Sequence, residues 1–260
     1  SSTIKLDSEF VNGTNAVALA GAVTGGNLGY HINQAGDVNQ DGLNDLLLGF
    51  GVSLPPGETF LVYGRTNLPA SMVLSNGWFN GTNGTRFTGT AGDFRMGRSA
   101  TFCGDMDGDG RTDLLLANEL GASLVYGRSS YPAQVTVTNT WLEAGNGVSL
   151  MGTAGQYIPI TGIGDINNDG LADIGFGGEQ GQISDGHLLV VFGRTNWPGT
   201  QLMLTDTWLN GTNGVRFSLG GSYVVGNLAG AGDFNGDGVD DLLLGKNADS
   251  ISGCNGGGAA

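Results

Sequence analysis

One ten-residue pattern occurs four times in this chain, and it constrains the fold more than any other feature. Each copy places an oxygen-bearing side chain at loop positions 1, 3, 5 and 9, a glycine at position 6 and an aliphatic or long residue at position 7. Position 1 is the first aspartate of each copy. The copies are GDVNQDGLND (36–45), GDMDGDGRTD (104–113), GDINNDGLAD (164–173) and GDFNGDGVDD (232–241).

The spacing of the oxygens indicates a metal site. Alternate residues of a tight turn can direct their oxygens at one centre, and a glycine at position 6 takes the positive φ that bends the chain around it. Position 7 then contributes only its backbone carbonyl. Hard oxygen ligands favour calcium, whereas a zinc site needs Cys or His. In the first copy the oxygen side chains and the position-7 residue are Asp37, Asn39, Asp41, Asp45 and Leu43.

Two alternatives, plain hairpin turns and EF-hands, fit the loops less well than a calcium site between strands. Asp-Gly hairpin turns are common between strands, but turn formation alone does not require the same oxygen positions four times. An EF-hand needs a bidentate Glu at position 12 between two helices, and here position 12 is apolar. An apolar run such as DLLLGF (45–50) follows each loop and is typical of a buried strand. The loops are therefore predicted to lie between strands.

The composition favours an all-β protein and argues against nucleic acid and membranes as partners. The chain has 50 glycines, six prolines and no long helical periodicity. Its formal charge is −14, and thirteen of its 24 acidic residues occupy the predicted ligand positions, so the acidity mainly serves metal binding. The ten Lys and Arg residues are scattered, and no apolar run approaches the ~20 residues of a membrane span. Neither nucleic acid binding nor membrane insertion is expected.

Two further motifs share the spacing of the loops. WFNGTNGTRF (78–87) has counterparts at 10–19, 141–150 and 208–217, and LVYGRTNLP (61–69) has counterparts at 124–132 and 190–198. A period of roughly 65 residues establishes an internal repeat. Each unit contains an apolar segment, a metal loop, an apolar strand, a variable loop, a strand ending in Tyr/Phe-Gly-Arg, a Pro turn and an alternating strand such as SMVLSN (71–76). Four strands joined as a meander predict a propeller blade, and the aromatic of the second motif (Trp78, Trp141, Trp208) is expected to pack between blades.

These motifs resemble the FG-GAP repeat of integrin α-subunit propellers, closest to its bacterial extracellular versions. The resemblance covers nearly the whole chain and rests on the loop followed by LLLG and preceded by elements such as RFTGTAGDFRMGRSA (86–100). It implies a β-propeller of about four four-stranded blades with about four calcium ions. The implied ligands, with position 7 acting through its carbonyl, are Asp37, Asn39, Asp41, Leu43 and Asp45; Asp105, Asp107, Asp109, Arg111 and Asp113; Asp165, Asn167, Asp169, Leu171 and Asp173; and Asp233, Asn235, Asp237, Val239 and Asp241.

The ligand set also predicts where the protein works. The second loop has four carboxylates where the others have three, so we expect it to bind calcium most tightly. Loops that lack the bidentate Glu fall in the ~10⁻⁴–10⁻³ M class of extracellular modules. An extracellular or cell-surface location is therefore expected. Because the sequence starts SSTIKL, without Met, we also expect it to be a processed or excised piece.

The chain is expected to form a single domain, 1–260, with incomplete blades at its two ends. The units are about 1–68, 69–132, 133–198 and 199–260, and residues 252–260 are expected to be a flexible glycine-rich tail. Unmatched strands at the ends leave three alternatives: a closed small ring, strand exchange with other copies, or a piece of a larger propeller. An exposed sheet edge can accept a strand from another chain, and a head-to-tail contact of that kind builds a filament unless it closes.

Three classes of function follow. Catalysis is not expected, because His31 and His187 lie in strand-like contexts without a nucleophile pattern, and metal ligation accounts for the Asp clusters. A calcium-dependent lectin or adhesin module of a larger surface protein is the alternative, with 51–58 and 178–186 as variable loops that could face a glycan or protein. A structural or adhesive extracellular protein that assembles head to tail with itself is favoured.

Two modifications are left open by the sequence. A disulfide between Cys103 and Cys254 would hold the C-terminal tail in an oxidising compartment, although Cys103 also fits the place of a small core residue. Asn-Gly-Thr sequons at Asn12, Asn80, Asn83 and Asn210 would accept glycans in a eukaryotic secretory pathway. The same tripeptide is also good turn sequence.

Overall fold

The predicted all-β fold class is confirmed. The computed structural model describes residues 11–22, 27–50, 56–93, 96–118, 120–152, 160–177, 187–218, 224–247 and 258–259. Over these residues the only α-helix is the single turn α1 (Asn139–Trp141), which runs into a π-helical turn, η1 (Leu142–Asn146). None of the described helical segments has the length and apolarity to cross a bilayer.

The strands fall in chain order into repeated groups. Those of the first half are β1 (Ala18–Gly21), β2 (Leu28–Gly36), β3 (Asp45–Phe50), β4 (Glu58–Val62), β5 (Ser71–Leu74), β6 (Gly84–Thr88), β7 (Ala100–Gly104), β8 (Asp113–Asn118) and β9 (Gly121–Val125). Those of the second half are β10 (Gln134–Thr136), β11 (Gly147–Met151), β12 (Ile160–Gly164), β13 (Asp173–Gly177), β14 (His187–Val191), β15 (Gln201–Met203), β16 (Gly214–Ser218), β17 (Val224–Gly232), β18 (Asp241–Asn247) and β19 (Gly258–Ala259).

The described strands form five sheets. Two central sheets have five strands each, in the orders β10-β6-β4-β3-β2 and β15-β11-β9-β8-β7. They are followed by β12-β13-β14-β16 and by β17-β18-β19, and the pair β1-β5 lies at the N-terminal side. The first strands of each repeat pair antiparallel, as in β2-β3-β4, β7-β8-β9 and β12-β13-β14. This confirms a meander for the first three strands of the first three repeats.

The predicted fourth strand of the meander is wrong. The segment SMVL, β5, leaves the sheet of β2, β3 and β4 and pairs parallel with β1, while β6 takes the fourth place by pairing antiparallel with β4. In the same way β10 pairs parallel with β6, and β15 with β11. Alternation in β5 buries Met72 and Leu74 and exposes Ser71 and Val73, which shows that one face is covered but not which sheet covers it. Neighbouring sheets therefore share strands.

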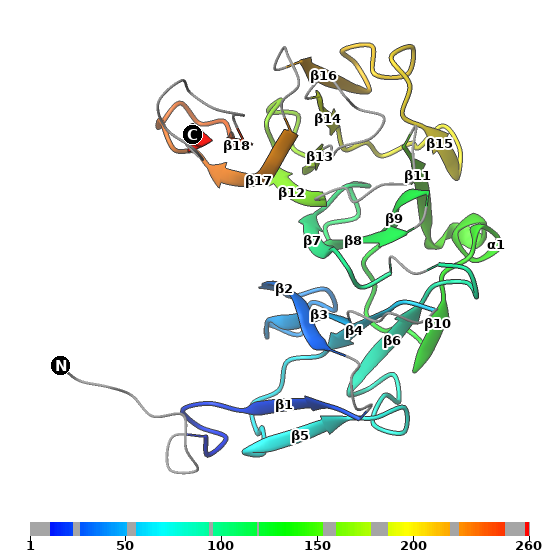
Figure 1. The fold of residues 1–260 in the computed structure, drawn as a ribbon, viewed down its shortest axis with the longest axis vertical. Helices are drawn as coiled ribbons and strands as arrows, with labels where there is room; N and C mark the ends of the chain where they lie inside the picture. Colours follow the sequence, from blue (N-terminus) through cyan, green and yellow to red (C-terminus); the bar gives the residue numbers. More distant parts are fainter. Residues whose placement is uncertain are drawn as a thin grey trace.

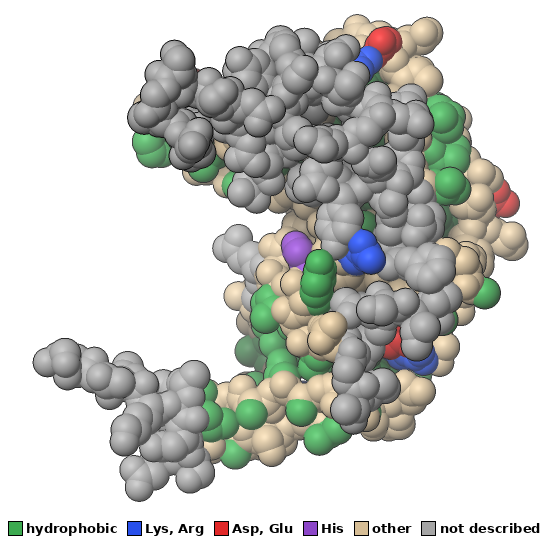
Figure 2. All heavy atoms as spheres, viewed as in Figure 1, with side chains coloured by type: hydrophobic (Ala, Val, Ile, Leu, Met, Phe, Trp, Pro, Cys, Tyr) green, Lys and Arg blue, Asp and Glu red, His purple; other side chains and the backbone are tan. Residues whose placement is uncertain are grey.

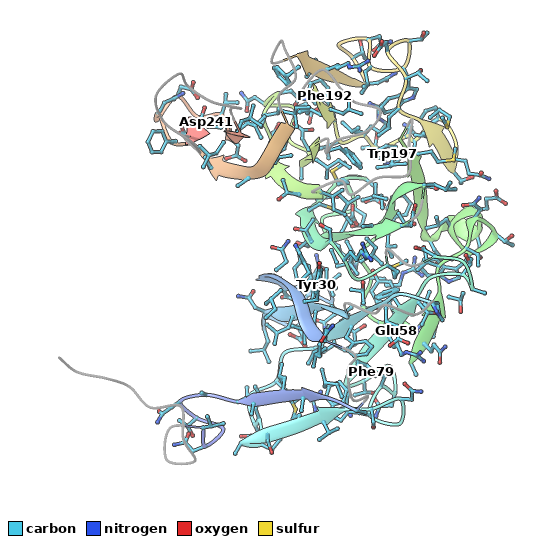
Figure 3. The ribbon with its side chains drawn as sticks, in the orientation of Figure 1. Tyr30, Glu58, Phe79, Phe192, Trp197 and Asp241 are labelled. Atoms are coloured by element: carbon cyan, nitrogen blue, oxygen red, sulfur yellow. The ribbon has the colours of Figure 1, made fainter. Side chains whose placement is uncertain are left out.

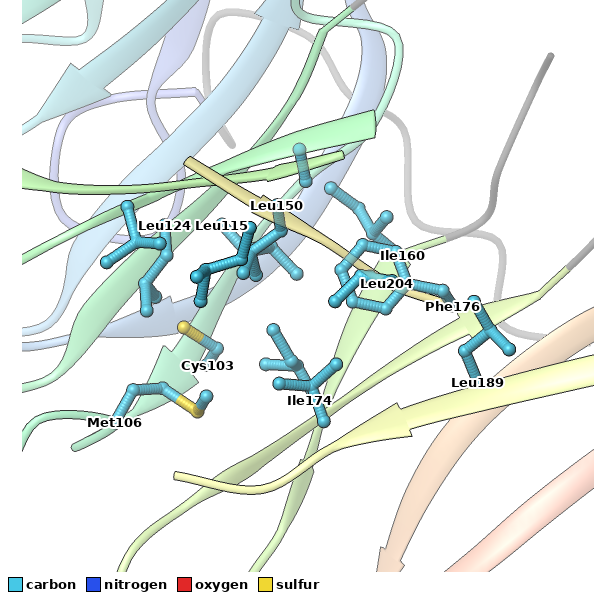
Figure 4. Close-up of a cluster of buried hydrophobic side chains, with 14 of the residues drawn as sticks. Cys103, Met106, Leu115, Leu124, Leu150, Ile160, Ile174, Phe176, Leu189 and Leu204 are labelled. Carbon is cyan, nitrogen blue, oxygen red and sulfur yellow. The ribbon is translucent and has the colours of Figure 1, made fainter. Parts of the chain in front are cut away.

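The sheets pack face to face, with apolar clusters between them. The largest cluster lies between the sheet of β7–β9 and the sheet of β12–β14 and includes Leu115, Leu150, Ile174 and Phe176 (Figure 4). Cys103 lies in this cluster, as expected for a small core residue. A second cluster joins β3, β4 and β6 to β8 and β9. Because each sheet has apolar residues on both faces, it needs a neighbour on each side to exclude water from them.

The sheets follow one another along an open arc. The β1-β5 pair lies at one end of the arc and the β17-β18 hairpin at the other (Figure 1). On the face drawn in Figure 2 the blue and red charged side chains are scattered, with no broad patch of one sign among the coloured residues. The described sheets do not close into a ring.

Candidate metal centre

All four acidic loops occupy the same place in the fold. Each connects two antiparallel strands: β2 to β3, β7 to β8, β12 to β13, and β17 to β18. The position-1 aspartate directly follows the first strand, and the position-9 aspartate begins the second. Strands therefore flank every loop, and the EF-hand alternative does not fit this fold.

The position-1 carboxylate organises each loop. In the second loop, Asp105 Oδ1 accepts the N–H groups of Gly108 (2.7 Å) and Asp109 (3.2 Å), and its Oδ2 accepts that of Gly110 (2.8 Å). The other three loops repeat the bonds from positions 5 and 6. These involve Asp37 with Asp41 and Gly42, Asp165 with Asp169 and Gly170, and Asp233 with Asp237 and Gly238. The bonds wrap the backbone around one carboxylate in all copies.

Positions 3 and 5 continue the same arrangement. In the second loop Asp107 Oδ1 accepts the Asp109 N–H (3.1 Å), and Asp109 Oδ1 accepts the Arg111 N–H (2.8 Å). The corresponding bonds exist in the other three loops at 2.8–3.0 Å. Short turns of this kind place the oxygens of positions 1, 3 and 5 on the inner side of the loop.

The loop backbone needs two left-handed residues, of which the sequence predicted one. Position 6 is glycine with φ of 82° to 90° in all four copies, and an added Cβ would meet nothing within 4 Å, so only the backbone conformation demands glycine there. Position 4 is also left-handed. It is a glycine in two loops, but Gln40 (φ 60°) and Asn168 (φ 58°) adopt it in the others.

The position-9 aspartates have a second role that the sequence did not reveal. Asp113 is fully buried, and its two oxygens accept the N–H groups of Met106 (2.9 Å) and Gly127 (2.6 Å). Asp45 and Asp173 are buried in the same way, with equivalent partners in their own repeats. Gly127 follows β9, so this carboxylate ties the loop to the third strand. A carboxylate oxygen has further acceptor capacity, so the bonds leave a ligand role open.

Like charges gather in the second loop. One carboxylate oxygen from each of Asp105, Asp107 and Asp109 lies within 4.8 Å of the others. Burial raises the pKa of Asp107, and the charges of Asp109 and Asp105 raise it further. Burial is also the main reason why the pKa of Asp113 rises to about 8. A bound cation would relieve this repulsion and favour the ionised carboxylates.

The second loop also differs from its neighbours in the group that contacts its position-5 carboxylate. In the first loop the Asn39 amide donates to Asp41 Oδ2 (3.1 Å), and in the third Asn167 donates to Asp169 Oδ2 (2.9 Å). Position 3 of the second loop is an aspartate, which has no such donor. A cation entering the first or third loop must compete with this amide. In the second loop the Arg111 guanidinium lies 3.5 Å from the corresponding Asp109 oxygen, so a cation must compete with this ion pair, although position 3 offers an additional negative charge.

Neighbouring loops touch, so the four loops form a row. The contacts join the Gln40 amide to the Gly110 carbonyl (2.7 Å), the Ala172 N–H to the Asp105 carbonyl (2.9 Å) and the Asp165 N–H to Asp240 Oδ2 (2.9 Å). Each of the first three loops therefore contacts the next repeat as well as its own strands. Stiffening one loop would stabilise the contact between two sheets.

The donor set fits calcium. Its side-chain donors are carboxylate and amide oxygens, they are presented by a loop with the same internal bonding in four copies, and the charge cluster favours a cation. That the residues at positions 1, 3, 5, 7 and 9 hold the ion stays a prediction, and the cluster of Asp105, Asp107 and Asp109 covers positions 1, 3 and 5 of the second loop. Bound there, calcium would neutralise the carboxylates and rigidify the loop.

The predicted aromatic packing has an arginine partner that the sequence did not single out. The Arg of each Tyr/Phe-Gly-Arg motif lies over the Trp of the same repeat. The distances from guanidinium carbon to ring centroid are 5.3 Å for Arg65–Trp78, 6.0 Å for Arg128–Trp141 and 5.2 Å for Arg194–Trp208. All three Trp side chains are partly buried, which supports a packing role.

The sequons differ in their surroundings. Asn80 and Asn210 are exposed, and their side-chain oxygens accept backbone N–H groups within the turn. Asn12 is exposed and bonded in the same way. Asn83 is partly buried and its amide nitrogen donates to the Trp78 carbonyl (3.2 Å), so a glycan there would have to replace a bond of the fold.

The remaining candidates are only partly described. Cys103 is buried as a free thiol, while Cys254 and nearly all of the 252–260 tail lie outside the described residues, so their pairing stays a prediction. Most of loop 51–58 and all of 178–186 lie outside them as well. His31 is partly buried in β2, where burial lowers its pKa, and His187 begins β14.

The comparisons with known proteins do not test the FG-GAP resemblance. No protein-family model matches the chain, and no curated protein matches it either. The FG-GAP resemblance is therefore carried by the four loops and their spacing.

Proposed function

We propose that this chain is a calcium-stabilised, non-catalytic repeat protein with a structural or adhesive role outside the cell. The observation that carries the proposal is the loop geometry, repeated four times with the same internal bonds. The same oxygen-rich turn occurs in the first hairpin of all four repeats. A turn that only connects two strands does not need this set of oxygen side chains. The row of contacts between loops gives the metal a mechanical role, because each loop bridges two sheets.

We further propose that the sheets belong to a propeller of about four FG-GAP-type blades, incomplete at both ends. Face-to-face stacking of successive antiparallel sheets supports this architecture, as does the regular donation of one strand to the preceding sheet. A rigid body of this kind suits a protein that holds a shape or presents surfaces. A concentration of calcium in the millimolar range would fill the loops, and that is an extracellular condition.

The proposal is tested by titrating the protein with calcium in an isothermal calorimeter. We expect about four sites, with the second loop tightest. Asp107→Asn should weaken that site about tenfold, because ligand charge tunes calcium affinity, and Asn39→Asp should strengthen the first loop. Both side chains are at least partly exposed, so both variants should fold in a chelator, although Asn39→Asp loses the amide hydrogen bond to Asp41 and adds a like charge to the loop. Failure to bind calcium at 10 mM (roughly 100 times a Kd of ~10⁻⁴ M) would disprove the assignment.

A calcium-dependent saccharide site is the second candidate, and one cavity favours it. A cavity of about 300 Å³ beside the second loop is lined by Asp107, Tyr126, Asn196, Trp197 and Thr200, among others. The Trp197 indole N–H is buried and has no hydrogen-bond partner among the described residues. Aromatic rings with hydroxyl, amide and carboxylate groups form a surface of the kind that neutral sugars contact.

This candidate predicts binding on a glycan array that calcium promotes and Trp197→Ala abolishes. The matched control is Trp208→Ala. Arg194 lies over both the Trp197 ring (5.4 Å) and the Trp208 ring (5.2 Å), but Trp208 does not line the cavity. Equal signals from the protein and both variants would reject the cavity as a sugar site. Sugar binding that does not depend on calcium would show that the sugar site works without the metal.

A further inference from the structure

The contact between neighbouring sheets is built the same way twice inside the chain. One side contributes the residue at loop position 2 and the third residue of the second strand. These are Val38 and Leu47 in the first repeat and Met106 and Leu115 in the second, with exposed fractions of 0–1%. The other side contributes a cross-strand pair from the first hairpin of the next sheet. The pairs are Ala100–Leu116 and Ile160–Phe176, all buried.

The last sheet carries the first half of this contact without a partner among the described residues. Phe234 occupies loop position 2 and is 86% exposed, and Leu243 is the third residue of β18 and is 54% exposed. Their counterparts at the two inner contacts are buried. This pair, named here the leading face, lies on the β17-β18 hairpin at one end of the arc (Figure 1).

The first complete sheet carries the second half. Ile32 pairs with Leu48 across β2 and β3, which is the place of Ala100–Leu116 and Ile160–Phe176 in the next two sheets. Ile32 is 67% exposed, whereas Ala100 and Ile160 are buried. Leu48 is already buried in the single copy, in a cluster with Phe60 and Leu74, so Ile32 is the exposed member of the pair. The surface around Ile32 is named here the trailing face. Leading and trailing faces are thus the two complementary halves of one contact.

Strand edges beside these faces complement each other as well. Strands β6, β11 and β16 pair antiparallel with β4, β9 and β14, but their counterpart β1 pairs only with β5 among the described strands. At the other end, the outer edge of β18 pairs, among those strands, only with the two-residue β19. In the other sheets the place beside the strand that corresponds to β18 is taken by a third strand (β4, β9 or β14), so the β1-β5 pair of a second copy could extend the sheet of β17-β18 by taking that place.

We propose that the leading face of one copy packs against the trailing face of a second copy, head to tail. The inference rests on the proposed structural function and names its partner surface. A second copy is the occupant because the chain already forms this contact with its own repeats, and the two faces do not meet within one molecule. Tyr30 on β2 and Asp241 at the start of β18 mark them at separate places along the arc (Figure 3). Each added copy exposes a new leading face, so assembly continues unless a ring closes.

Sedimentation velocity over a dilution series in calcium tests the proposal. The protein should form a concentration-dependent ladder of oligomers. Leu243→Asp and Ile32→Asp should each raise the dissociation constant at least about tenfold, because an unpaired charge would be buried in the contact. Both residues are exposed in the single copy, so the variants should fold. The matched control is Leu120→Asp, which is also exposed (56%) but lies between β8 and β9, away from both faces.

Mixing the two variants gives the sharpest result. Leu243→Asp retains the trailing face and Ile32→Asp retains the leading face, so the mixture should stop at a one-to-one dimer. Oligomers of unlimited length in the mixture, a protein that stays monomeric at all concentrations, or equal weakening by Leu120→Asp would each overturn the proposal. A calcium titration of the same samples separates the two ideas: calcium binding by a strictly monomeric protein would leave the metal function intact and reject the assembly.

Discussion

Calcium is expected to raise the melting temperature of this protein by about 10 °C or more over the value in a chelator. Binding to the folded state alone stabilises it by about 2.7 kcal/mol per site at a concentration 100 times Kd. For a chain of this size roughly 1 kcal/mol corresponds to a 2–4 °C shift. The physical cause is local: the ion replaces repulsion among Asp105, Asp107 and Asp109 with attraction. The measurement is differential scanning calorimetry in calcium and in EDTA.

Two controls make the thermal result specific. Magnesium at the same concentration should give a smaller shift, because it requires a stricter octahedral site and loses its water reluctantly. Asp105→Ala should reduce the calcium shift, whereas Asp206→Asn should not, since Asp206 is exposed, pairs with Arg216 and lies outside the loops. Superimposable curves in calcium and EDTA would show that the loops are only turns.

The second large effect is expected from Asp113→Ala, measured by urea unfolding in EDTA so that no metal contributes. The change removes the acceptor of two hydrogen bonds from Met106 and Gly127 in a fully buried place. Each buried donor left without a partner costs about 1–3 kcal/mol, so the free energy of unfolding should fall by roughly 2–4 kcal/mol. The elevated pKa of Asp113 reflects the cost of its buried charge, which offsets part of this loss.

Asp241 provides the matched comparison. It occupies the same loop position and accepts the Phe234 N–H (2.9 Å), but Phe234 and the neighbouring loop are exposed to water. Water can satisfy the donor when the carboxylate is removed, so Asp241→Ala should cost less than about 1 kcal/mol. If both substitutions lower the free energy of unfolding by the same small amount, the buried position-9 aspartates do not stabilise the fold.

The metal loops were predictable from the sequence because their interactions are local. Every bond accepted by the Asp105 carboxylate comes from a residue at most five positions later, and Gly110 permits the turn by its own conformational freedom. The absence of Glu at position 12 and the apolar runs also placed the loops between strands. The left-handed position 4 escaped prediction, since Gln40 and Asn168 carry no glycine signal.

Other features of the candidate site depend on distant residues. The position-9 aspartate is a ligand candidate by spacing, but its role as a brace depends on Gly127, fourteen residues later and beyond β9. The cavity beside the second loop combines Asp107 with Tyr126 and Trp197 from two neighbouring sheets. No local pattern relates these residues, because sheet stacking decides which of them meet.

The all-β class, the repeat and the four acidic turns follow from the sequence alone, since periodicity and hydrogen bonds over a few residues are written in neighbouring positions. The three-dimensional fold was needed to show that β5 joins the preceding sheet, because alternation marks a buried face without naming its partner. It was also needed to show which copies of one motif are covered. Val38 and Phe234 hold equivalent positions, yet one is buried and the other exposed, because burial depends on whether another sheet stacks against them.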